Sequence, residues 1–377
     1  MSSLVLQTSP HLASSGAAVA RHPDGRVVFV RGAAPEEEVE AEIVKEKGRF
    51  LETETVRVIR PGPTRVEPPC PIFGECGGCT TQHVRYSEQV ASKSRALRDA
   101  LVRVAKLEIG EGLFRDPWVG SELGYRARAR LAVAPDGTVG FRRAQSHGGV
   151  QVTHCPVLVP ALNDKLADLS RHAGKGIVEV EILAVAEQAL VGETKPVVHD
   201  DGFGVLHYAA QSFSQSNVLG NLALLADIEL QLGGRPIEYA LELYSGHGNF
   251  TRVLAKHAAR VVAIEGDESA SALARAALPK VDHRAEPVEA AVEGLVQAGL
   301  RFDLALADPP RAGMSISVLK GLARLSDHLL YVSCDVGTFA RDVARLGEQG
   351  LKLRSVRLFD FYPHTPHGEV LGVFQRA

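Results

Sequence analysis

The sequence predicts an α/β protein in which a small β-barrel and a central α+β region precede a parallel α/β domain. Three observations support this prediction. Residues 1–60 alternate short β-rich runs with turns, the stretch 61–71 is rich in proline, and from about residue 210 onward strands alternate with helices. We therefore expect three domains, over residues 1–60, 61–209 and 210–377.

The composition is that of an ordinary soluble globular protein. The 377 residues are 45% hydrophobic and 23% charged, with a net charge of −3, which argues against indiscriminate coating of nucleic acid but allows a local basic surface. No apolar run reaches the roughly 18 residues that a membrane span requires. The first residues also lack the pattern of a secretory signal. We expect a cytoplasmic monomer with no membrane partner.

The N-terminal region is expected to form a five-stranded barrel. The PDG turn at 23–25 separates two runs of alternating apolar residues, which is typical of a β-hairpin. The proline-rich stretch 61–71 serves as a linker because proline cannot continue a strand ladder. Beyond it, apolar residues recur at helical spacing over 87–107, and 125–133 has the pattern of a strand.

Four of the five cysteines suit a metal or iron–sulfur centre. Three of them form a C-x5-C-x2-C pattern, and the fourth lies in THCP. Clustered cysteines without a secretory signal indicate metal ligation rather than disulfides. Zinc, with His154 as a possible ligand, is the alternative, although structural zinc sites usually show two C-x2-C pairs and this chain has one. The four residues are Cys70, Cys76, Cys79 and Cys155.

A glycine-containing turn over 239–270 predicts a cofactor site. An apolar strand, a turn with Gly246 and Gly248, a helix and a second strand ending in Glu265 follow one another. An acidic residue at that position grips a ribose in sites for dinucleotides and for S-adenosylmethionine. Thr251 replaces the third glycine of the dinucleotide pattern, and this favours a methyl donor. A purely structural βαβ turn is the plain alternative.

Two strand ends carry chemically active residues. The apolar strand in 302–314 ends at Asp308, where ligands bind in parallel sheets. Cys334 lies between a strand and a helix in 328–346. The helix dipole lowers a thiol pKa from about 8.5 toward neutrality, so we expect Cys334 to be a reactive nucleophile. A small buried hydrophobic residue is the alternative interpretation.

Glu369 precedes the last apolar strand, within 359–375. Its neighbours are apolar, and burial raises the pKa of a carboxylate toward the working range of a general base. We therefore prefer Glu369 as the base over His364 and His367, each of which is also explained as a core or surface residue.

The chain resembles the RNA 5-methyluridine methyltransferase family, and in particular its iron–sulfur ribosomal branch. The resemblance covers essentially the whole length, with GGCTTQH, THCP, FSQSN, LYSGHGNFT, DPPRAG, VSCD and HTPHGE in the family's order. It implies a Rossmann-like class I S-adenosylmethionine methyltransferase domain. It also implies an OB-like TRAM barrel at the N-terminus and a central domain that carries an iron–sulfur loop.

The resemblance also implies roles for single residues. Cys334 becomes the nucleophile and Glu369 the proton acceptor. The contacts around S-adenosylmethionine and the target base become Gln215, Tyr244, Glu265 and Asp308, and the ligands of a [4Fe–4S] cluster become Cys70, Cys76, Cys79 and Cys155. The chain departs from the family at Ser214, Ser216, Ser245, Asp335 and Gly368. None of these departures removes a reacting group, but they leave the target base and its position open.

The implied reaction is methylation of carbon-5 of a uridine, with large-subunit ribosomal RNA as the expected partner. A thiolate that adds to carbon-6 places negative charge on carbon-5, which is otherwise too poor a nucleophile. Cytosine carbon-5 methylation of RNA or DNA is an alternative. The DPPR run lacks the cysteine usual in cytosine enzymes, whereas Asp335 keeps that alternative open. A non-catalytic iron–sulfur RNA-binding protein is the second alternative.

A basic strand offers a phosphate-binding face. Arg126, Arg128 and Arg130 alternate with alanines, so one face of the strand carries three guanidinium groups, and Arg142 and Arg143 follow on the next candidate strand. An ordinary solvated strand face explains the same pattern.

Overall fold

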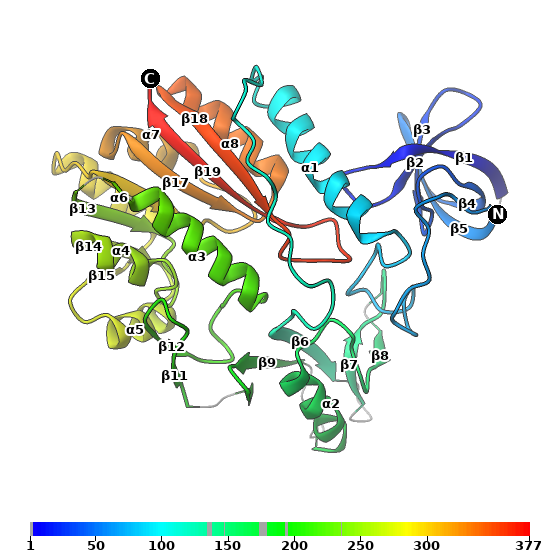
Figure 1. Ribbon diagram of the computed structural model, residues 1–377, viewed down its shortest axis with the longest axis horizontal. Helices are drawn as coiled ribbons and strands as arrows, with labels where there is room; N and C mark the ends of the chain where they lie inside the picture. Colours follow the sequence, from blue (N-terminus) through cyan, green and yellow to red (C-terminus); the bar gives the residue numbers. More distant parts are fainter. Residues whose placement is uncertain (1–2, 134–137, 147, 173–178, 193–194, 235) are drawn as a thin grey trace.

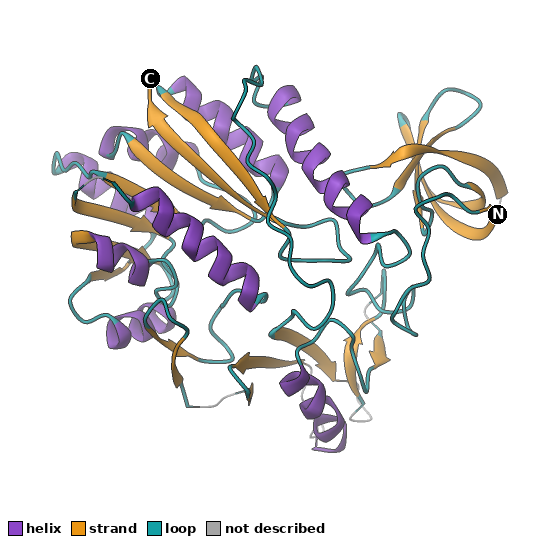
Figure 2. Cartoon of the chain, in the orientation of Figure 1, coloured by secondary structure: helices purple, strands orange, loops and turns teal. Residues whose placement is uncertain are grey.

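The computed structural model describes residues 3–133, 138–146, 148–172, 179–192, 195–234 and 236–377. A barrel, a small central sheet and a large sheet follow one another along the chain (Figure 1). Figure 2 shows that most of the described helices surround the large sheet, whereas the barrel consists of strands and loops. No helix in the described part of the chain is both long and apolar enough to span a membrane.

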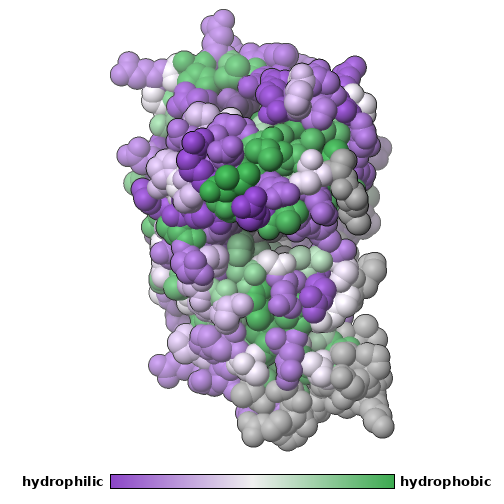
Figure 3. Space-filling view, turned by 90° about the vertical axis from the view of Figure 1, so that its right-hand side faces the viewer, coloured by the Kyte–Doolittle hydropathy of each residue, from purple (hydrophilic) through white to green (hydrophobic). Residues whose placement is uncertain are grey.

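The N-terminal strands close into the predicted five-stranded barrel, in the order β1-β2-β3-β5-β4. Alternate side chains such as Val28, Val30 and Leu51 point inward and are fully buried. The predicted hairpin is confirmed as the pair of β2 and β3. Seen from the barrel's side, the surface is largely hydrophilic with apolar side chains between the polar ones (Figure 3). The strands are β1 (Ser3–Leu12), β2 (Ala18–Arg21), β3 (Val27–Arg31), β4 (Glu38–Lys47) and β5 (Phe50–Arg60).

The central region is a five-stranded antiparallel sheet in the order β10-β9-β6-β7-β8. Helix α2 (Pro160–His172) contributes Leu162 and Leu166 to the core of this sheet. A two-stranded sheet then leads toward the C-terminal part of the chain. The strands are β6 (Arg128–Val133), β7 (Val139–Arg142), β8 (Gly149–Gln151), β9 (Glu179–Val185) and β10 (Gln188–Val191), followed by β11 (Val197–Asp200) and β12 (Val205–Tyr208).

The C-terminal sheet has seven strands in the order β15-β14-β13-β16-β17-β19-β18. The first five strands in this order are parallel, and β19 runs antiparallel to both of its neighbours. The strands are β13 (Ile237–Leu243), β14 (Ala258–Glu265), β15 (Asp282–Ala285), β16 (Leu304–Ala307), β17 (His328–Ser333), β18 (Leu351–Phe359) and β19 (Glu369–Arg376).

Helices cover both faces of this sheet. One face packs in a single core with α6, α7, α8 and the earlier helix α1, and the other packs with α3 and α4. Helix α5 lies beside β14 and β15. The helices are α1 (Tyr86–Arg103), α3 (Val218–Leu232), α4 (Thr251–His257), α5 (Glu268–Ala277), α6 (Val288–Gln297), α7 (Ile316–Leu325) and α8 (Val336–Glu348).

Helix α1 confirms the helix predicted over 87–107. It packs against the large C-terminal sheet and α8 rather than against the central sheet. Leu97 and Leu101 are buried in the same core as Phe339 of α8. Farther along, Trp118 forms a bridge with Phe359 at the end of β18. The stretch from α1 to Trp118 is therefore packed against the C-terminal sheet. The domain boundaries placed at 60/61 and 209/210 stay predictions.

Candidate active site

Four of the predicted site residues lie at one edge of the large sheet. Strands β13, β14, β16 and β17 are parallel neighbours, so their carboxyl ends meet at that edge, where ligands bind in open α/β sheets. One predicted site residue ends β14. The other three directly follow β13, β16 and β17. In strand order they are Tyr244, Glu265, Asp308 and Cys334.

Glu369 reaches the same edge from the opposite direction. Because β19 is antiparallel to β17, it begins where β17 ends. Ser333 pairs with Val370, so continuing the register by one residue sets Cys334 beside Glu369. Two residues 35 positions apart in the sequence, the predicted nucleophile and the predicted base, are thereby brought together.

The charges around Cys334 oppose its ionisation. Burial, followed by the charge of Glu369, raises the pKa of the Cys334 thiol to about 11, and Asp308 adds to the effect. Arg311 acts in the opposite direction. The expectation that this pKa lies toward neutrality is therefore wrong, because burial and the charges of Glu369 and Asp308 raise it. The side chain of Asp335 also caps that helix, accepting a hydrogen bond from the Thr338 amide at 2.8 Å.

The two carboxyl groups beside Cys334 are more basic than carboxyl groups in water. Burial raises the pKa of Asp308 to about 7. Burial, together with the charge of Asp308, raises the pKa of Glu369 well above its usual value. The prediction that burial raises the pKa of Glu369 is confirmed. Each carboxyl therefore holds a proton more firmly than a carboxyl in water does.

Tyr362 orients Glu369 and leaves one of its oxygens open. The Tyr362 hydroxyl donates to Glu369 Oε1 at 3.2 Å. Glu369 Oε2 is buried, with no hydrogen-bond partner among the described residues. This oxygen is thus available to receive a proton. Sequence reasoning missed Tyr362 and Arg311, although both lie within the FDFYPHTPHGE and DPPR stretches that it singled out.

The glycine turn after β13 is held by Glu265. One carboxylate oxygen accepts from the Gly246 amide and the other from the Asp267 amide, both at 2.8 Å. Tyr244 has a φ of 61°, an uncommon conformation for a residue with a side chain, and Gly248 has a φ of 96°. Gly248 also lies against Ala274 of α5. The predicted donor turn is therefore a tightly built loop clamped by its own acidic residue.

Gln215 lies in the wall of a separate cavity. This cavity, with a volume of about 280 Å³, is also lined by His247 and Asn249 of the glycine turn and by Tyr208. Gln215 Oε1 is buried, with no partner in the described part of the chain. The structure thus brings Gln215 to the glycine turn from the central side of the molecule.

Glu242 is a buried acid that sequence reasoning missed. It lies on β13, two residues before Tyr244, and is fully buried. Neither of its carboxylate oxygens has a hydrogen-bond partner among the described residues, and burial raises its pKa to about 8. The strand pattern could not reveal it, because a single acid in an apolar run does not show which way it points.

The four predicted metal-ligating cysteines gather around one small cavity of about 30 Å³, which His154 also lines. Burial raises the pKa of Cys79 to about 12. The Gly78 amide lies 3.4 Å from Cys76 Sγ. Among the described residues, no group of three or more His, Cys, Asp or Glu side chains converges on a point where it could hold a metal ion. The structure therefore brings the four thiols together around one cavity.

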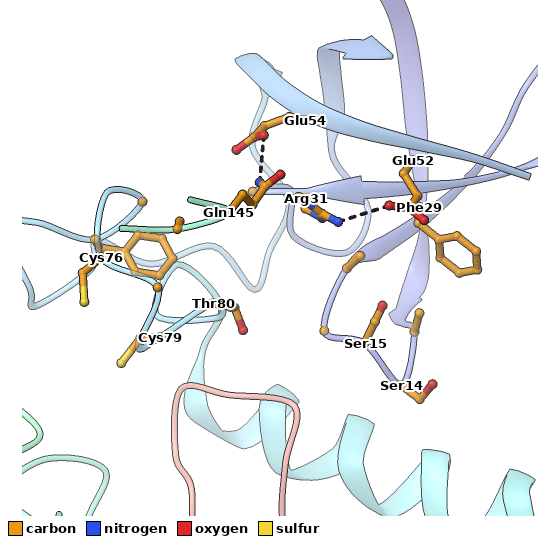
Figure 4. A pocket seen from close by; sticks show the side chains of 18 of the residues that line it. Ser14, Ser15, Phe29, Arg31, Glu52, Glu54, Cys76, Cys79, Thr80 and Gln145 are labelled. Carbon is orange, nitrogen blue, oxygen red and sulfur yellow. Dashed lines mark hydrogen bonds and ion pairs between the residues drawn. The ribbon is translucent and has the colours of Figure 1, made fainter. Parts of the chain in front are cut away.

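The cysteine loop also borders a larger cavity of about 530 Å³ between it and the barrel (Figure 4). Phe29 and Arg31 of β3 lie on the barrel side of this cavity, whereas Phe73 lies on the loop. Arg31 pairs with Glu52 at 3.2 Å. In Figure 4 the sulfur atoms of the labelled cysteines point away from these barrel residues.

The predicted basic strand is largely neutralised. Glu181 of β9 binds Arg128 at 3.0 Å and Arg130 at 2.7 Å, and Arg142 pairs with Glu179. The Arg126 side chain donates to the Arg128 carbonyl and lines the cysteine cavity instead. The structure therefore favours an ordinary strand face over a row of free guanidinium groups.

Comparisons with known proteins agree with this fold. The family model described as tRNA (Uracil-5-)-methyltransferase matches residues 289–377, and the TRAM domain model matches residues 4–56. Among solved structures, the Pyrococcus abyssi tRNA (uracil-54, C5)-methyltransferase in complex with S-adenosyl-L-homocysteine covers 98% of this chain and 100% of its own. It has a TM-score of 0.76 at 21% identity, so it shows a shared fold and confirms the predicted one.

Full-length relatives extend the match. The 23S rRNA (uracil(1939)-C(5))-methyltransferase RlmD of Vibrio campbellii is 32% identical over 93% of this chain and 91% of its own length. RlmD of Pseudomonas fluorescens is 34% identical over 97% of this chain and 90% of its own length. At this identity and coverage, the chain belongs to the family of RNA uracil-C5 methyltransferases.

Proposed function

We propose that this enzyme methylates carbon-5 of a uridine in large-subunit ribosomal RNA, with S-adenosylmethionine as the methyl donor. The observation that carries the proposal is the register of β17 and β19, which sets the Cys334 thiol beside the Glu369 carboxylate. The named substrate of the RlmD relatives is a uracil of 23S rRNA, which supports the choice of RNA.

The residues divide the reaction into easier steps. The Cys334 thiolate adds to carbon-6 of the uracil, and carbon-5 gains the electron density it needs to accept a methyl group. S-adenosylmethionine would supply that methyl group as an electrophile, with S-adenosylhomocysteine as the leaving group. Glu369 then takes the proton from carbon-5, and Cys334 leaves carbon-6 as the double bond forms again. The open Oε2 atom of Glu369 is the acceptor that this step requires.

Arg311 and Asp308 adjust the two reacting groups. Arg311 lowers the pKa of Cys334, so we assign to it the stabilisation of the thiolate. Asp308, through its charge, raises the pKa of Glu369 and makes it a stronger proton acceptor. Both lie in the DPPR run, at the end of the strand next to β17.

The glycine turn fits the methyl donor. Gly246 and Gly248 allow the backbone to approach a ligand, and Glu265 lies at the end of the neighbouring strand, where a ribose hydroxyl is bound in such sites. Each oxygen of Glu265 already accepts one amide, but a carboxylate has about four acceptor positions and retains room for a hydroxyl. Tyr244 and Asp308 border the same edge.

We further propose that Cys70, Cys76, Cys79 and Cys155 hold a [4Fe–4S] cluster. Each iron of such a cluster binds a single thiolate, so four cysteines around one cavity fit it without converging on one point. The positive iron ions of a cluster would offset the free-energy cost of burying the negative thiolates. The cluster would also tie the cysteine loop to the central sheet. A structural zinc ion would instead require tetrahedral convergence on one atom.

The metal is identified by purification without oxygen. We expect a brown protein with about four irons per chain, and bleaching when any one of the four cysteines is replaced by serine. Cys334→Ser is the matched control, because it lies outside this group and should leave the colour unchanged. Stoichiometric zinc in a colourless, active protein would refute the iron assignment.

The chemistry is tested with a ribosomal RNA fragment and labelled donor. Cys334→Ala should abolish methyl transfer while donor binding survives. Glu369→Gln should accumulate a covalent protein–RNA adduct, because addition and methylation proceed while removal of the proton does not. Fragments that carry 5-fluorouridine at the target should trap the enzyme. Trapping by 5-fluorocytidine or by DNA alone would replace uracil with cytosine as the substrate.

A further inference from the structure

The loop that leads into the catalytic carboxylate is bonded directly to the cysteine loop. Residues 360–368 connect β18 to β19, which begins at Glu369. The carbonyl of His364 in this loop accepts the Thr80 amide at 2.9 Å and the Thr81 amide at 3.1 Å. Thr80 immediately follows Cys79. In Figure 4 the C-terminal loop passes below Thr80 and beside α1.

Gln89 of α1 completes this junction. Its Oε1 atom accepts the His364 amide at 2.9 Å, and its Nε2 atom lies 3.2 Å from His364 Nδ1. The same Nε2 atom donates to the carbonyls of Thr81 at 3.0 Å and Val84 at 2.7 Å. Gln89, Thr81 and His364 are each only 2% exposed. One buried amide therefore binds both the segment after the cysteines and the loop before Glu369.

The backbone of His364 needs this support. Its φ is 65°, in the left-handed region that residues with side chains rarely adopt. Such a conformation persists only where surrounding contacts fix it. Strained backbone conformations of this kind cluster at functional sites. Here the contacts are the Gln89 side chain and the amides of Thr80 and Thr81.

The same loop fixes the catalytic carboxylate. Tyr362, two residues before His364, donates to Glu369 Oε1 at 3.2 Å. The buried ammonium of Lys93, one helical turn after Gln89, pairs with Asp360 at 2.5 Å and donates to the Tyr362 carbonyl at 2.9 Å. A continuous set of contacts thus runs from the cysteine loop through His364 and Tyr362 to Glu369.

We propose that Gln89 and His364 are positioning residues through which the ordered cysteine loop holds Glu369 in place for removal of the proton. The proposal rests on the proposed function, in which Glu369 is that base. It also gives the proposed [4Fe–4S] centre a defined role: the centre would order the 70–79 loop, which is bonded in turn to the segment before β19. No electron transfer is required.

The first test uses the wild-type holoprotein and compares hydrogen exchange before and after chelation of the metal. We expect the amides of Thr80, Thr81 and His364 to exchange at least about tenfold faster once the loop is released, because each is bonded across the junction. Amides of β14 serve as an internal reference and should not change. Equal protection of the 360–368 loop in both forms would overturn the proposal.

The second test uses Gln89→Ala, with Ser94→Ala as the matched control. Ser94 lies on the same helix, and among the described residues its hydroxyl bonds only to the Val90 carbonyl of that helix. We expect kcat of Gln89→Ala to fall by about 10- to 100-fold, as for a misplaced reacting group, with the KM for the donor unchanged. The covalent adduct with RNA should accumulate as in Glu369→Gln, while the absorbance of the metal centre is retained.

The outcomes separate the two proposals. If Glu369→Gln accumulates no adduct, the assigned role of Glu369 fails. If Glu369→Gln accumulates the adduct but Gln89→Ala turns over as fast as Ser94→Ala, only the positioning role of Gln89 fails. Should Gln89→Ala not fold, the hydrogen-exchange comparison on the wild-type protein decides the question.

Discussion

At the scale of single residues, the reactivity of Cys334 depends on charges that come from distant parts of the chain. The half-buried thiol is close to the charges of Asp308, which follows β16, and of Glu369, which begins β19, and both raise its pKa. The sequence showed correctly that the cysteine precedes a helix. It could not show that two carboxylates face it, because their approach depends on the order and direction of the strands. Desolvation and the two charges then raise the pKa of the thiol.

This arrangement predicts the pH dependence of alkylation at Cys334. Because the folded-state pKa is raised to about 11, the thiolate fraction and the rate with iodoacetamide should still be rising at pH 10. Glu369→Gln removes a negative charge and should lower this pKa. The alkylation rate at pH 8 would then rise by about tenfold for each unit by which the pKa of Cys334 falls. Peptide mass spectrometry measures Cys334 separately from the other cysteines.

The control for this experiment is Glu348→Gln, an exposed position on the helix that follows Cys334. It removes the same charge from the chain without changing the surroundings of the thiol. Equal alkylation rates for the wild type and Glu369→Gln would show that the carboxylate does not act on Cys334.

At the scale of elements, the sequence predicted the strand–turn–helix units well and their assembly less well. Local periodicity and glycine placement located the barrel strands, α1 and the units around Glu265, Asp308 and Cys334. The antiparallel insertion of β19 between β17 and β18 is a long-range pairing that leaves no local pattern. It is this insertion that brings Glu369 to Cys334. The apolar neighbours of Glu369 predicted its burial, but they could not predict the strand order that sets it beside Cys334, and its role as the base stays a proposal.

The basic strand shows the same limit. Alternation placed Arg128 and Arg130 on β6, but their partner Glu181 comes from β9, which pairs with β6 across about fifty residues of sequence. A pattern within one strand cannot show which charges the neighbouring strand presents. Ion pairs between the two strands thus engage arginines that the sequence pattern alone presents as free to bind phosphate.

At the scale of the whole molecule, the barrel lies on the far side of α1 from the large sheet (Figure 1), and the cysteine loop lies beside the barrel. The cavity of about 530 Å³ between them is lined by the rings of Phe29, Phe50 and Phe73. Unpaired RNA bases stack on such rings, and sequence-tolerant stacking is a common way to hold a strand near a catalytic site. With the arginines of β6 paired, we expect this cavity to contribute more to RNA binding than that strand does.

Phe50→Ala tests this expectation. The Phe50 ring packs edge-on against Phe29 with 5.6 Å between centroids, and Lys47 lies 5.0 Å from the centroid of Phe50. Loss of one stacking ring should weaken RNA binding by about 1–3 kcal/mol, which appears as a higher KM for RNA with kcat nearly unchanged. Val44→Ala, an exposed apolar position on β4, is the matched control for the barrel surface.

If Arg130→Ala raised the KM for RNA more than Phe50→Ala did, the strand of arginines rather than the aromatic cavity would be the main contact. A fall in kcat with unchanged KM would instead place Phe50 in the support of the cysteine loop.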